Sequence, residues 1–256
     1  MHRARKRFGQ HFLHDHGVID DIVGAIAPDA TDTLVEIGPG QGAITGPLAR
    51  LAGTLHAIEF DRDLAASLRR QYQDSRSVTI HEADALRFDF GQLGAKLRIV
   101  GNLPYNISTP LLFHLIDYRE QIQDMHFMLQ KEVVQRMAAP PGSRDFGRLT
   151  VMLGCCMQVA HLFDVPPESF SPPPKVMSAV VRLAPLPAST FRIANHAVLK
   201  KLVSQAFTQR RKTIRNALRQ HANEAQLVAA GIDPGTRPEQ VAIAQWIELA
   251  NQLHEQ

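Results

Sequence analysis

The sequence predicts an α/β fold with a mostly parallel, doubly wound, Rossmann-like sheet, followed by a small all-helical domain. Two observations support this prediction. Short β-rich runs alternate with amphipathic stretches through the first two-thirds of the 256 residues, which is typical of parallel strands joined by helical crossovers. Beyond about residue 188 the alternation stops, and only helical periodicity remains.

Six largely apolar runs of four to six residues are expected to form strands: 33–37, 54–59, 78–81, 97–100, 125–129 and 178–183. Helical periodicity predicts helices over 62–73, 109–116, 196–207, 213–220 and 239–252. A proline-punctuated stretch, 184–187, follows the last predicted strand. Because prolines mark breaks in regular structure, we place a domain boundary there. The expected domains are a catalytic domain at 1–187 and a helical, RNA-binding domain at 188–256.

The composition is that of an ordinary globular protein, with 45% hydrophobic and 21% charged residues. No apolar run reaches the roughly 18 residues needed to span a bilayer, and no signal-peptide pattern follows the basic N-terminus. We therefore expect a cytoplasmic protein without a membrane partner. Cys155 and Cys156 are adjacent in an apolar run. This spacing suits neither a disulfide nor a metal site, so both are expected to be buried.

The basic charge is segregated along the chain. Residues 1–16 hold four Lys/Arg and one acid, and residues 200–219 hold seven Lys/Arg and none. The rest of the chain has 17 basic and 24 acidic residues, a net charge of −7, although the whole chain is +3. An acidic body with basic segments is typical of proteins that bind nucleic-acid phosphates. Two solvated basic helix faces would give the same pattern.

A glycine-rich turn follows the first predicted strand, at residues 36–43. Glycines allow the backbone to approach a ligand closely. Gly38, Gly40 and Ala43 also fit the dinucleotide fingerprint, and Glu59 lies where an acid would bind a ribose. The turn alone therefore leaves a nicotinamide cofactor open as an alternative.

Three acids at the ends of successive predicted strands favour a different cofactor. Glu36 and Glu59 end or follow the first two strands, and the third strand runs into Asp84 and Ala85. A carboxylate at the third strand can accept a hydrogen bond from an adenine amine lying across the sheet. This arrangement predicts a class I methyltransferase that binds S-adenosyl-L-methionine.

The segment after the fourth strand carries the predicted chemistry. An adenine amine is a poor nucleophile, so an enzyme must hold both of its protons with acceptors. The Asn102 side chain and the Leu103 backbone carbonyl can supply them, Pro104 would stiffen the turn, and Tyr105 would stack on an extruded base. Positioning then supplies most of the rate, and no metal is required.

Five motifs, in order, closely resemble the bacterial KsgA/RsmA family of small-subunit ribosomal RNA adenine dimethyltransferases. They cover nearly the whole chain and are the segments 5–13 (RKRFGQHFL), 36–40 (EIGPG), 102–110 (NLPYNISTP), 170–176 (FSPPPKV) and 207–213 (FTQRRKT). The resemblance implies N6,N6-dimethylation of two adjacent adenosines near the 3′ end of small-subunit rRNA, during late subunit assembly. It also implies the small ribosomal subunit as partner, and we expect the protein to act as a monomer.

The resemblance implies site residues as well. It places cofactor contacts on His11, Leu13, Gly38, Gly40, Glu59, Asp84, Ala85 and Asn102. Many members have asparagine at the position of His11, so this residue contacts the cofactor through either its side chain or its backbone. Phe170 would cover the second face of the target base, with a core role as its alternative. The basic residues expected to contact RNA are Arg5, Lys6, Arg7, Arg210, Arg211 and Lys212.

Three other functions compete with this prediction. A non-catalytic RNA-binding or assembly protein could have kept the same fold, although the intact glycine turn, the acids and Asn102 argue against it. A nicotinamide-dependent oxidoreductase is supported only by the glycine pattern. The third alternative keeps the chemistry but acts on large-subunit rRNA, as antibiotic-resistance methyltransferases do. The segments 170–176 and 210–213 favour the small subunit.

Overall fold

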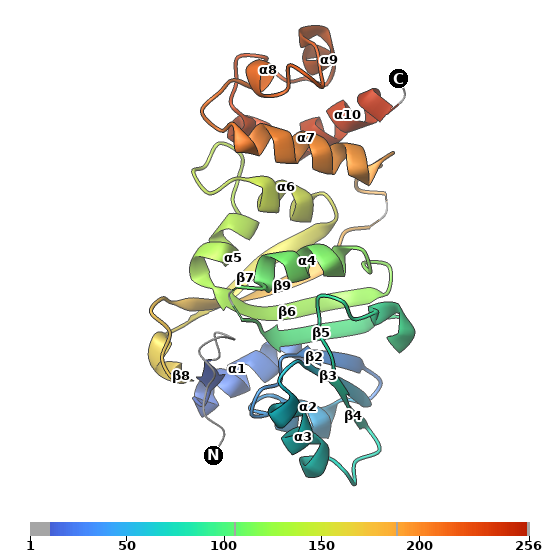
Figure 1. The fold of residues 1–256 in the computed structure, drawn as a ribbon, viewed down its shortest axis with the longest axis vertical. Helices are drawn as coiled ribbons and strands as arrows, with labels where there is room; N and C mark the ends of the chain where they lie inside the picture. Colours follow the sequence, from blue (N-terminus) through green and yellow to red (C-terminus); the bar gives the residue numbers. More distant parts are fainter. Residues whose placement is uncertain (1–10, 105, 188, 255–256) are drawn as a thin grey trace. The chain divides into compact units, whose positions relative to one another are not determined.

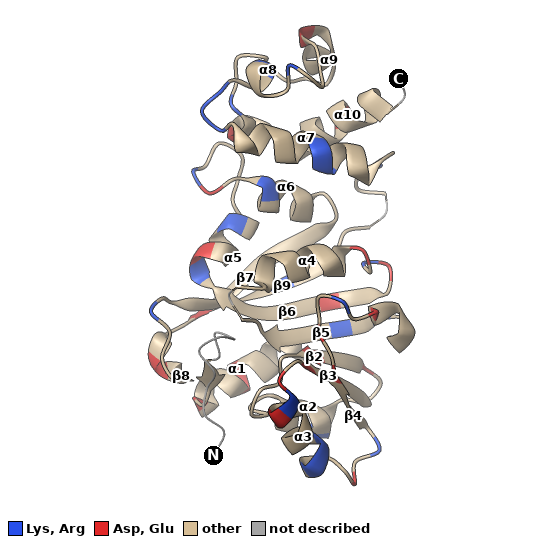
Figure 2. Cartoon of the chain, viewed as in Figure 1, with Lys and Arg blue, Asp and Glu red and all other residues tan. Residues whose placement is uncertain are grey.

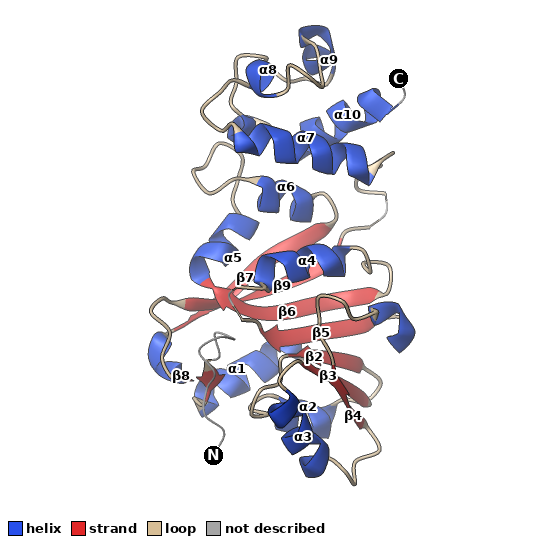
Figure 3. Cartoon of the chain, in the orientation of Figure 1, coloured by secondary structure: helices blue, strands red, loops and turns tan. Residues whose placement is uncertain are grey.

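The fold centres on a mostly parallel sheet. The structure is a computed structural model that describes residues 11–104, 106–187 and 189–254. Within them, seven strands form one sheet in the order β4-β3-β2-β5-β6-β9-β7 (Figures 1 and 3). Their bounds are β2 Thr33–Ile37, β3 Thr54–Glu59, β4 Val78–Glu82, β5 Leu97–Asn102, β6 Ile122–Gln130, β7 Met157–Val165 and β9 Ser178–Pro185.

The strand directions produce a switch point in the middle of the sheet. Strands β4, β3, β2, β5 and β6 run parallel, and β9 pairs antiparallel to β6. The chain moves outward from β2 to β3 and β4, then returns to the other side of β2 at β5. Ligands of doubly wound sheets bind at the carboxyl ends of strands where the order reverses. The predicted strands and doubly wound order are confirmed, and β7 was not predicted.

Ten α-helices are described: α1 His16–Ile26, α2 Thr45–Leu51, α3 Arg62–Gln71, α4 Ser108–Ile116, α5 Lys131–Met137, α6 Arg148–Gly154, α7 His196–Thr208, α8 Ile214–Ala217, α9 Glu224–Ala229 and α10 Ile243–His254. Short 3-10 turns cover Phe90–Leu93, Pro167–Ser169 and Pro238–Gln240. The predicted helix at 239–252 starts too early. Val241 is extended, and the Gln245 side chain accepts from the Ala242 N–H at the start of α10. The predicted helix at 213–220 is also shorter, because α8 ends at Ala217.

Helix α1 packs on one face of the sheet. Asp15 begins it by accepting hydrogen bonds from the N–H groups of Gly17 and Val18, which satisfies donors that the first helical turn leaves free. Ile19, Ile22 and Ile26 of α1 are buried and pack with apolar residues of β2, β5, β6 and β9. The cluster forms the floor and support of the site described below.

A separate two-stranded pairing joins segments far apart in the sequence. β1 (Phe12–Leu13) pairs antiparallel with β8 (Phe170–Ser171). The Ser169 hydroxyl also donates to the Asp15 carboxylate over 3.1 Å. Two of the motifs that support the family resemblance are therefore neighbours in the fold.

The described chain divides into two compact units. The first holds the described residues up to Val134 together with Ala160–Pro185, and the second holds Gln135–Val159 and the described residues from Leu186 onward. A single cut near residue 187 thus omits Gln135–Val159, whose helix α6 packs against α7 and α10. Cys155 and Cys156 lie buried in this unit, as expected. The assignment of catalysis and RNA binding to separate domains stays a prediction.

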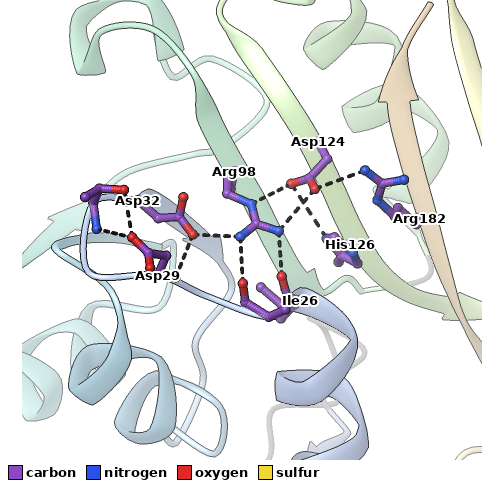
Figure 4. Close-up of polar contacts among 9 residues, drawn as sticks. Ile26, Asp29, Asp32, Arg98, Asp124, His126 and Arg182 are labelled. Atoms are coloured by element: carbon purple, nitrogen blue, oxygen red, sulfur yellow. Dashed lines mark hydrogen bonds and ion pairs between the residues drawn. The ribbon is translucent and has the colours of Figure 1, made fainter.

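A buried arginine connects several elements of the first unit (Figure 4). The Arg98 guanidinium donates to both carboxylate oxygens of Asp124, at 3.0 and 3.1 Å, and to Asp32 at 2.7 Å. It also donates to the backbone carbonyls of Ile26 and Ala27 at the end of α1. Arg98 therefore ties β5 to β6, to the end of α1 and to the turn that precedes β2.

No described helix is long and apolar enough to cross a membrane.

We expect Arg98→Met to lower the free energy of unfolding by about 3–5 kcal/mol, because it leaves buried carboxylates without their partner. Arg182→Met is the matched control. Arg182 is 3.4 Å from Asp124 with a side chain that is 44% exposed, so its loss should cost less than about 1 kcal/mol. Chemical denaturation measures both variants. Equal losses would contradict the role given to Arg98.

Candidate functional site

A cavity of about 280 Å³ lies at the carboxyl ends of the parallel strands, where the strand order reverses. All eight predicted cofactor residues line it: His11, Leu13, Gly38, Gly40, Glu59, Asp84, Ala85 and Asn102. They come from the β1 segment and from the ends of four neighbouring strands or the loops that follow. The fold thus brings together residues that are up to 91 positions apart in the sequence.

The glycine-rich turn needs glycine for two different reasons. Gly38 and Gly40 have φ values of +68° and +60°, a region that side-chain-bearing residues rarely occupy. Gly101 at the end of β5 faces the turn from the next strand, and a Cβ there would lie 2.5 Å from the Ile37 carbonyl oxygen. The backbone can therefore line the cavity closely on both sides of the switch point.

Glu59 holds the glycine turn in place. Its Oε2 accepts from the Gly40 N–H at 3.0 Å, and its Oε1 accepts from the Asp61 N–H at 2.8 Å. Burial raises the pKa of Glu59, while these backbone hydrogen bonds oppose the rise. Each carboxylate oxygen keeps a second lone pair, so Glu59 can accept from ligand hydroxyls while it supports the turn.

Asp84 lies at the end of the cavity formed by β4. Its Oδ1 accepts from the Leu86 N–H at 3.0 Å, and its Oδ2 lies 4.0 Å from Arg87 Nε. The Asp84 side chain is 37% exposed. A carboxylate oriented by a backbone donor and still open to solvent can accept from a ligand amine.

Glu36 is the least accessible acid of the cavity. It is 1% exposed, and its Oε2 has no hydrogen-bond partner. Burial raises the pKa of the Glu36 carboxyl to about 8; the nearby Thr45 hydroxyl opposes part of the rise, and the charge of Glu59 adds to it. An acid that is protonated near neutrality and lacks a partner is a candidate for pairing with a cation.

Asn102 is held by the N-terminal segment. Its Nδ2 donates to the His11 carbonyl at 3.0 Å, which fixes the side-chain amide and leaves Oδ1 as its acceptor. The next residue is fixed by the sheet, because the Leu103 N–H donates to the Met128 carbonyl at 3.2 Å. Pro104 also lines the cavity. The two predicted acceptors thus lie on consecutive residues at its wall.

The side chain of His11 is engaged with another loop. Its Nδ1 lies 2.7 Å from the Pro172 carbonyl, in the proline-rich segment that follows β8. The pairing of β1 with β8 brings the two segments together. The His11 backbone therefore supports Asn102, and its ring supports the proline-rich loop.

Several predicted residues lie away from this arrangement. Phe170 is 2% exposed and packs in the apolar cluster beneath the cavity, so its contact with a base stays a prediction. Tyr105, Arg5, Lys6 and Arg7 lie outside the described residues. Arg210, Arg211 and Lys212 are exposed in the turn between α7 and α8.

The sequence interpretation missed two cavity residues. Phe60 is 59% exposed directly after Glu59 and lines the cavity. An aromatic residue beside the second acid was a signal that could have identified it. His126 also lines the cavity but lies within β6 and is 3% exposed; nothing in its sequence neighbourhood distinguishes it from a core residue. Among the described residues, no group of three or more His, Cys, Asp or Glu side chains could hold a metal ion.

The chain is similar to known methyltransferases over nearly its whole length. A family model described as "Ribosomal RNA adenine dimethylase" matches residues 1–255. The chain is 55% identical to the ribosomal RNA small subunit methyltransferase A of Aromatoleum aromaticum, over 98% of this chain and 95% of that protein. Identity to the protein of that name from Pseudomonas putida is 52%, over 100% and 97% of the two chains.

Two solved structures have similar folds. A dimethyladenosine transferase from Plasmodium falciparum has a TM-score of 0.81 and 25% identity, over 96% of this chain and 98% of that one. The 23S rRNA methyltransferase ErmE has a TM-score of 0.71 and 26% identity, over 95% and 99%. The predicted Rossmann-like methyltransferase fold class is therefore confirmed.

Glu36→Gln should change how stability depends on pH. The folded-state pKa of Glu36 is raised from 4.5 to about 8, so its contribution to stability is full below pH 4.5 and is lost as pH rises towards 8. The variant cannot ionise, so relative to the parent it should gain roughly 1.4 kcal/mol per pH unit in that window.

Chemical denaturation of the ligand-free protein at pH 5, 6.5 and 8 measures this difference. Glu224→Gln is the control, because the Glu224 side chain is 59% exposed and its removal should leave the pH dependence unchanged. Parallel pH profiles for Glu36→Gln and the parent would show that Glu36 ionises normally in the fold.

Proposed function

The chain belongs to the ribosomal RNA adenine dimethylase family, as its motifs predicted, and we propose that it dimethylates the N6 atoms of two adjacent adenosines near the 3′ end of small-subunit rRNA. The observation that carries this proposal is the fixed pair Asn102 and Leu103 at the wall of a cavity that holds all the predicted cofactor residues. Action late in subunit assembly, as a monomer in the cytoplasm, stays a prediction.

The cavity residues fit S-adenosyl-L-methionine as methyl donor. Asp84 can accept from the adenine amine, and Glu59 can accept from the ribose hydroxyls. Phe60 offers an exposed ring between them and can stack on the adenine. The orphan Oε2 of Glu36 fits a positively charged ligand group. When bound, the donor supplies an electrophilic methyl group on a sulfonium sulfur.

The protein's contribution to the reaction is positioning. An adenine amine has its lone pair delocalised into the ring, and two acceptors on its protons favour the geometry that localises it. Asn102 Oδ1 and the Leu103 carbonyl supply these acceptors, and the His11 carbonyl keeps the Asn102 amide from rotating. Orientation of this kind accounts for large rate effects without a covalent intermediate or strong base.

Basic residues of the second unit provide the proposed rRNA contacts. Figure 2 shows Lys and Arg along α6, α7 and the connection from α7 to α8. In that connection Arg211 and Lys212 are exposed. Arg210 is also exposed, and its Nη2 donates to the carbonyls of Arg144 and Phe146 at 2.8 and 3.1 Å. Arg210 therefore also organises the loop before α6.

Small-subunit rRNA is a better-supported substrate than large-subunit rRNA. The relatives named as small-subunit methyltransferases are 52–55% identical to the chain, whereas the 23S rRNA methyltransferase is 26% identical.

Labelled methyl transfer tests the proposed function. Purified small subunits that lack the modification are incubated with the protein and labelled S-adenosylmethionine, beside large subunits and naked rRNA. We expect incorporation into small subunits, recovered as N6,N6-dimethyladenosine. No incorporation there, or incorporation only into large subunits, would overturn the proposal.

Asn102→Ala should lower the rate of methyl transfer by about 100-fold or more, since removing one oriented hydrogen-bonding group from a transition state commonly costs this much. RNA affinity should stay within about twofold, because Asn102 lies in the cavity. Asn102→Asp keeps an acceptor but loses the donor to the His11 carbonyl, so it should have intermediate activity. Single-turnover rates and filter binding measure both effects. Loss of RNA binding with retained transfer would mean that the two sites have been exchanged.

Arg211→Ala combined with Lys212→Ala should weaken rRNA binding and reduce the salt dependence of its logarithm by up to about 2, close to 0.9 for each phosphate contact. Arg210→Ala should weaken binding and also raise proteolytic cleavage of the loop around Arg144, which the double variant leaves intact. Arg70→Ala, an exposed change on α3, is the control. An unchanged salt slope in the double variant would remove this turn from the RNA interface.

A further inference from the structure

Two buried polar side chains of the cavity have no role in the assignments above. Glu36 on β2 and His126 on β6 are 1% and 3% exposed, and both line the cavity. Glu36 Oε2 and both ring nitrogens of His126 lack hydrogen-bond partners. A buried polar group left unpaired costs about 1–3 kcal/mol, so two such groups on one cavity indicate a shared ligand.

The sheet places these two residues in one row. Glu36 is the register partner of Val100, and Val100 is the register partner of His126. Neighbouring strands lie about 4.8 Å apart, and residues in register point to the same face. Glu36 and His126 therefore flank Val100 on the face covered by α1, where Ile22 also lines the cavity. A small polar group above Val100 can contact both.

The surroundings of His126 determine what its ring offers. Its Nδ1 lies 3.9 Å from Asp124 Oδ1, and Asp124 is itself fixed by Arg98 and Arg182 (Figure 4). Burial lowers the pKa of His126 to about 4, so the ring is neutral near pH 7. The nearby carboxylate favours the proton on Nδ1, which leaves Nε2 as an acceptor. Together with Glu36 Oε2, the cavity floor therefore offers two acceptors.

The order of strands identifies the part of the donor that meets this floor. Asp84 follows β4 and Glu59 ends β3, so the proposed adenine and ribose contacts occupy one end of the cavity. Continuing across β2, β5 and β6 leads to Glu36, Val100 and His126. The remaining part of S-adenosylmethionine is its amino-acid end, with one ammonium and one carboxylate. Two acceptors suit the ammonium.

We propose that Glu36 and His126 together bind the α-ammonium group of the methyl donor, with His126 Nε2 and Glu36 Oε2 accepting its protons. The proposal rests on the donor site assigned above. It makes His126 a donor-binding residue and extends the donor site to β6.

Calorimetry with two ligands tests it. S-adenosylhomocysteine carries the ammonium, and its deaminated analogue lacks only that group. His126→Phe keeps a ring but has no acceptor, and it should weaken S-adenosylhomocysteine binding about tenfold while leaving the affinity for the deaminated analogue unchanged. Hydrogen bonds to charged groups contribute about 1.5–3 kcal/mol, which corresponds to this factor or more. His126→Gln can present an acceptor and should recover part of the discrimination.

Met128→Leu is the matched control, because Met128 lies two residues along the same face of β6 and lines the same cavity. This change should shift the affinities of both ligands by the same factor. If His126→Phe does the same, or changes neither affinity, the ring only shapes the cavity and the proposal is wrong.

The result also separates this proposal from the donor site on which it rests. Failure of the unaltered protein to bind either ligand would overturn the donor site itself. Equal affinity of the unaltered protein for both ligands would leave the donor site in place and overturn only the ammonium contact. Binding of the deaminated analogue to each variant shows that the variant has folded.

Discussion

The buried Arg98 guanidinium connects the elements on which the cavity depends. It bonds to Asp124 on β6, to Asp32 before β2 and to the last carbonyls of α1. Helix α1 packs on the face of the sheet that carries the cavity floor. Burying a charge is costly unless its hydrogen bonds are satisfied, and here five acceptor oxygens surround it. The same cluster fixes Asp124 beside His126, so a structural ion network sets the electrostatics of a proposed ligand contact.

The sheet was largely predictable because its strands carry a local signal. β2 and β3 are dense apolar runs buried on both faces, and their predicted bounds agree with the structure. β7 was not predicted, because about half of its residues are partly exposed and its alternation is irregular. β1 and β8 contain two residues each and exist only through a pairing across 158 positions. Such pairing depends on the tertiary fold, which no local pattern encodes.

The site was predictable where function required residues at strand ends. Glu59, Asp84 and Asn102 follow or end parallel strands, so the doubly wound order alone brings them to one edge. His126 lies inside a strand, where a polar residue can equally belong to a core network. Its exposure to the cavity depends on how deeply α1 and β9 leave the sheet uncovered. Phe170 shows the converse, because its neighbourhood in sequence indicated a base contact and the fold buries it in the core.

The hydrogen bond from Asn102 to the His11 carbonyl makes the beginning of the chain part of the reaction centre. The sheet can fold and bury its core without this segment, yet the amide that faces the substrate would then be free to turn. Two further contacts hold the segment, through β8 and the Pro172 carbonyl. The orientation of the acceptor is therefore inherited from a remote clasp, and any event that opens the clasp disarms the site while leaving the fold intact.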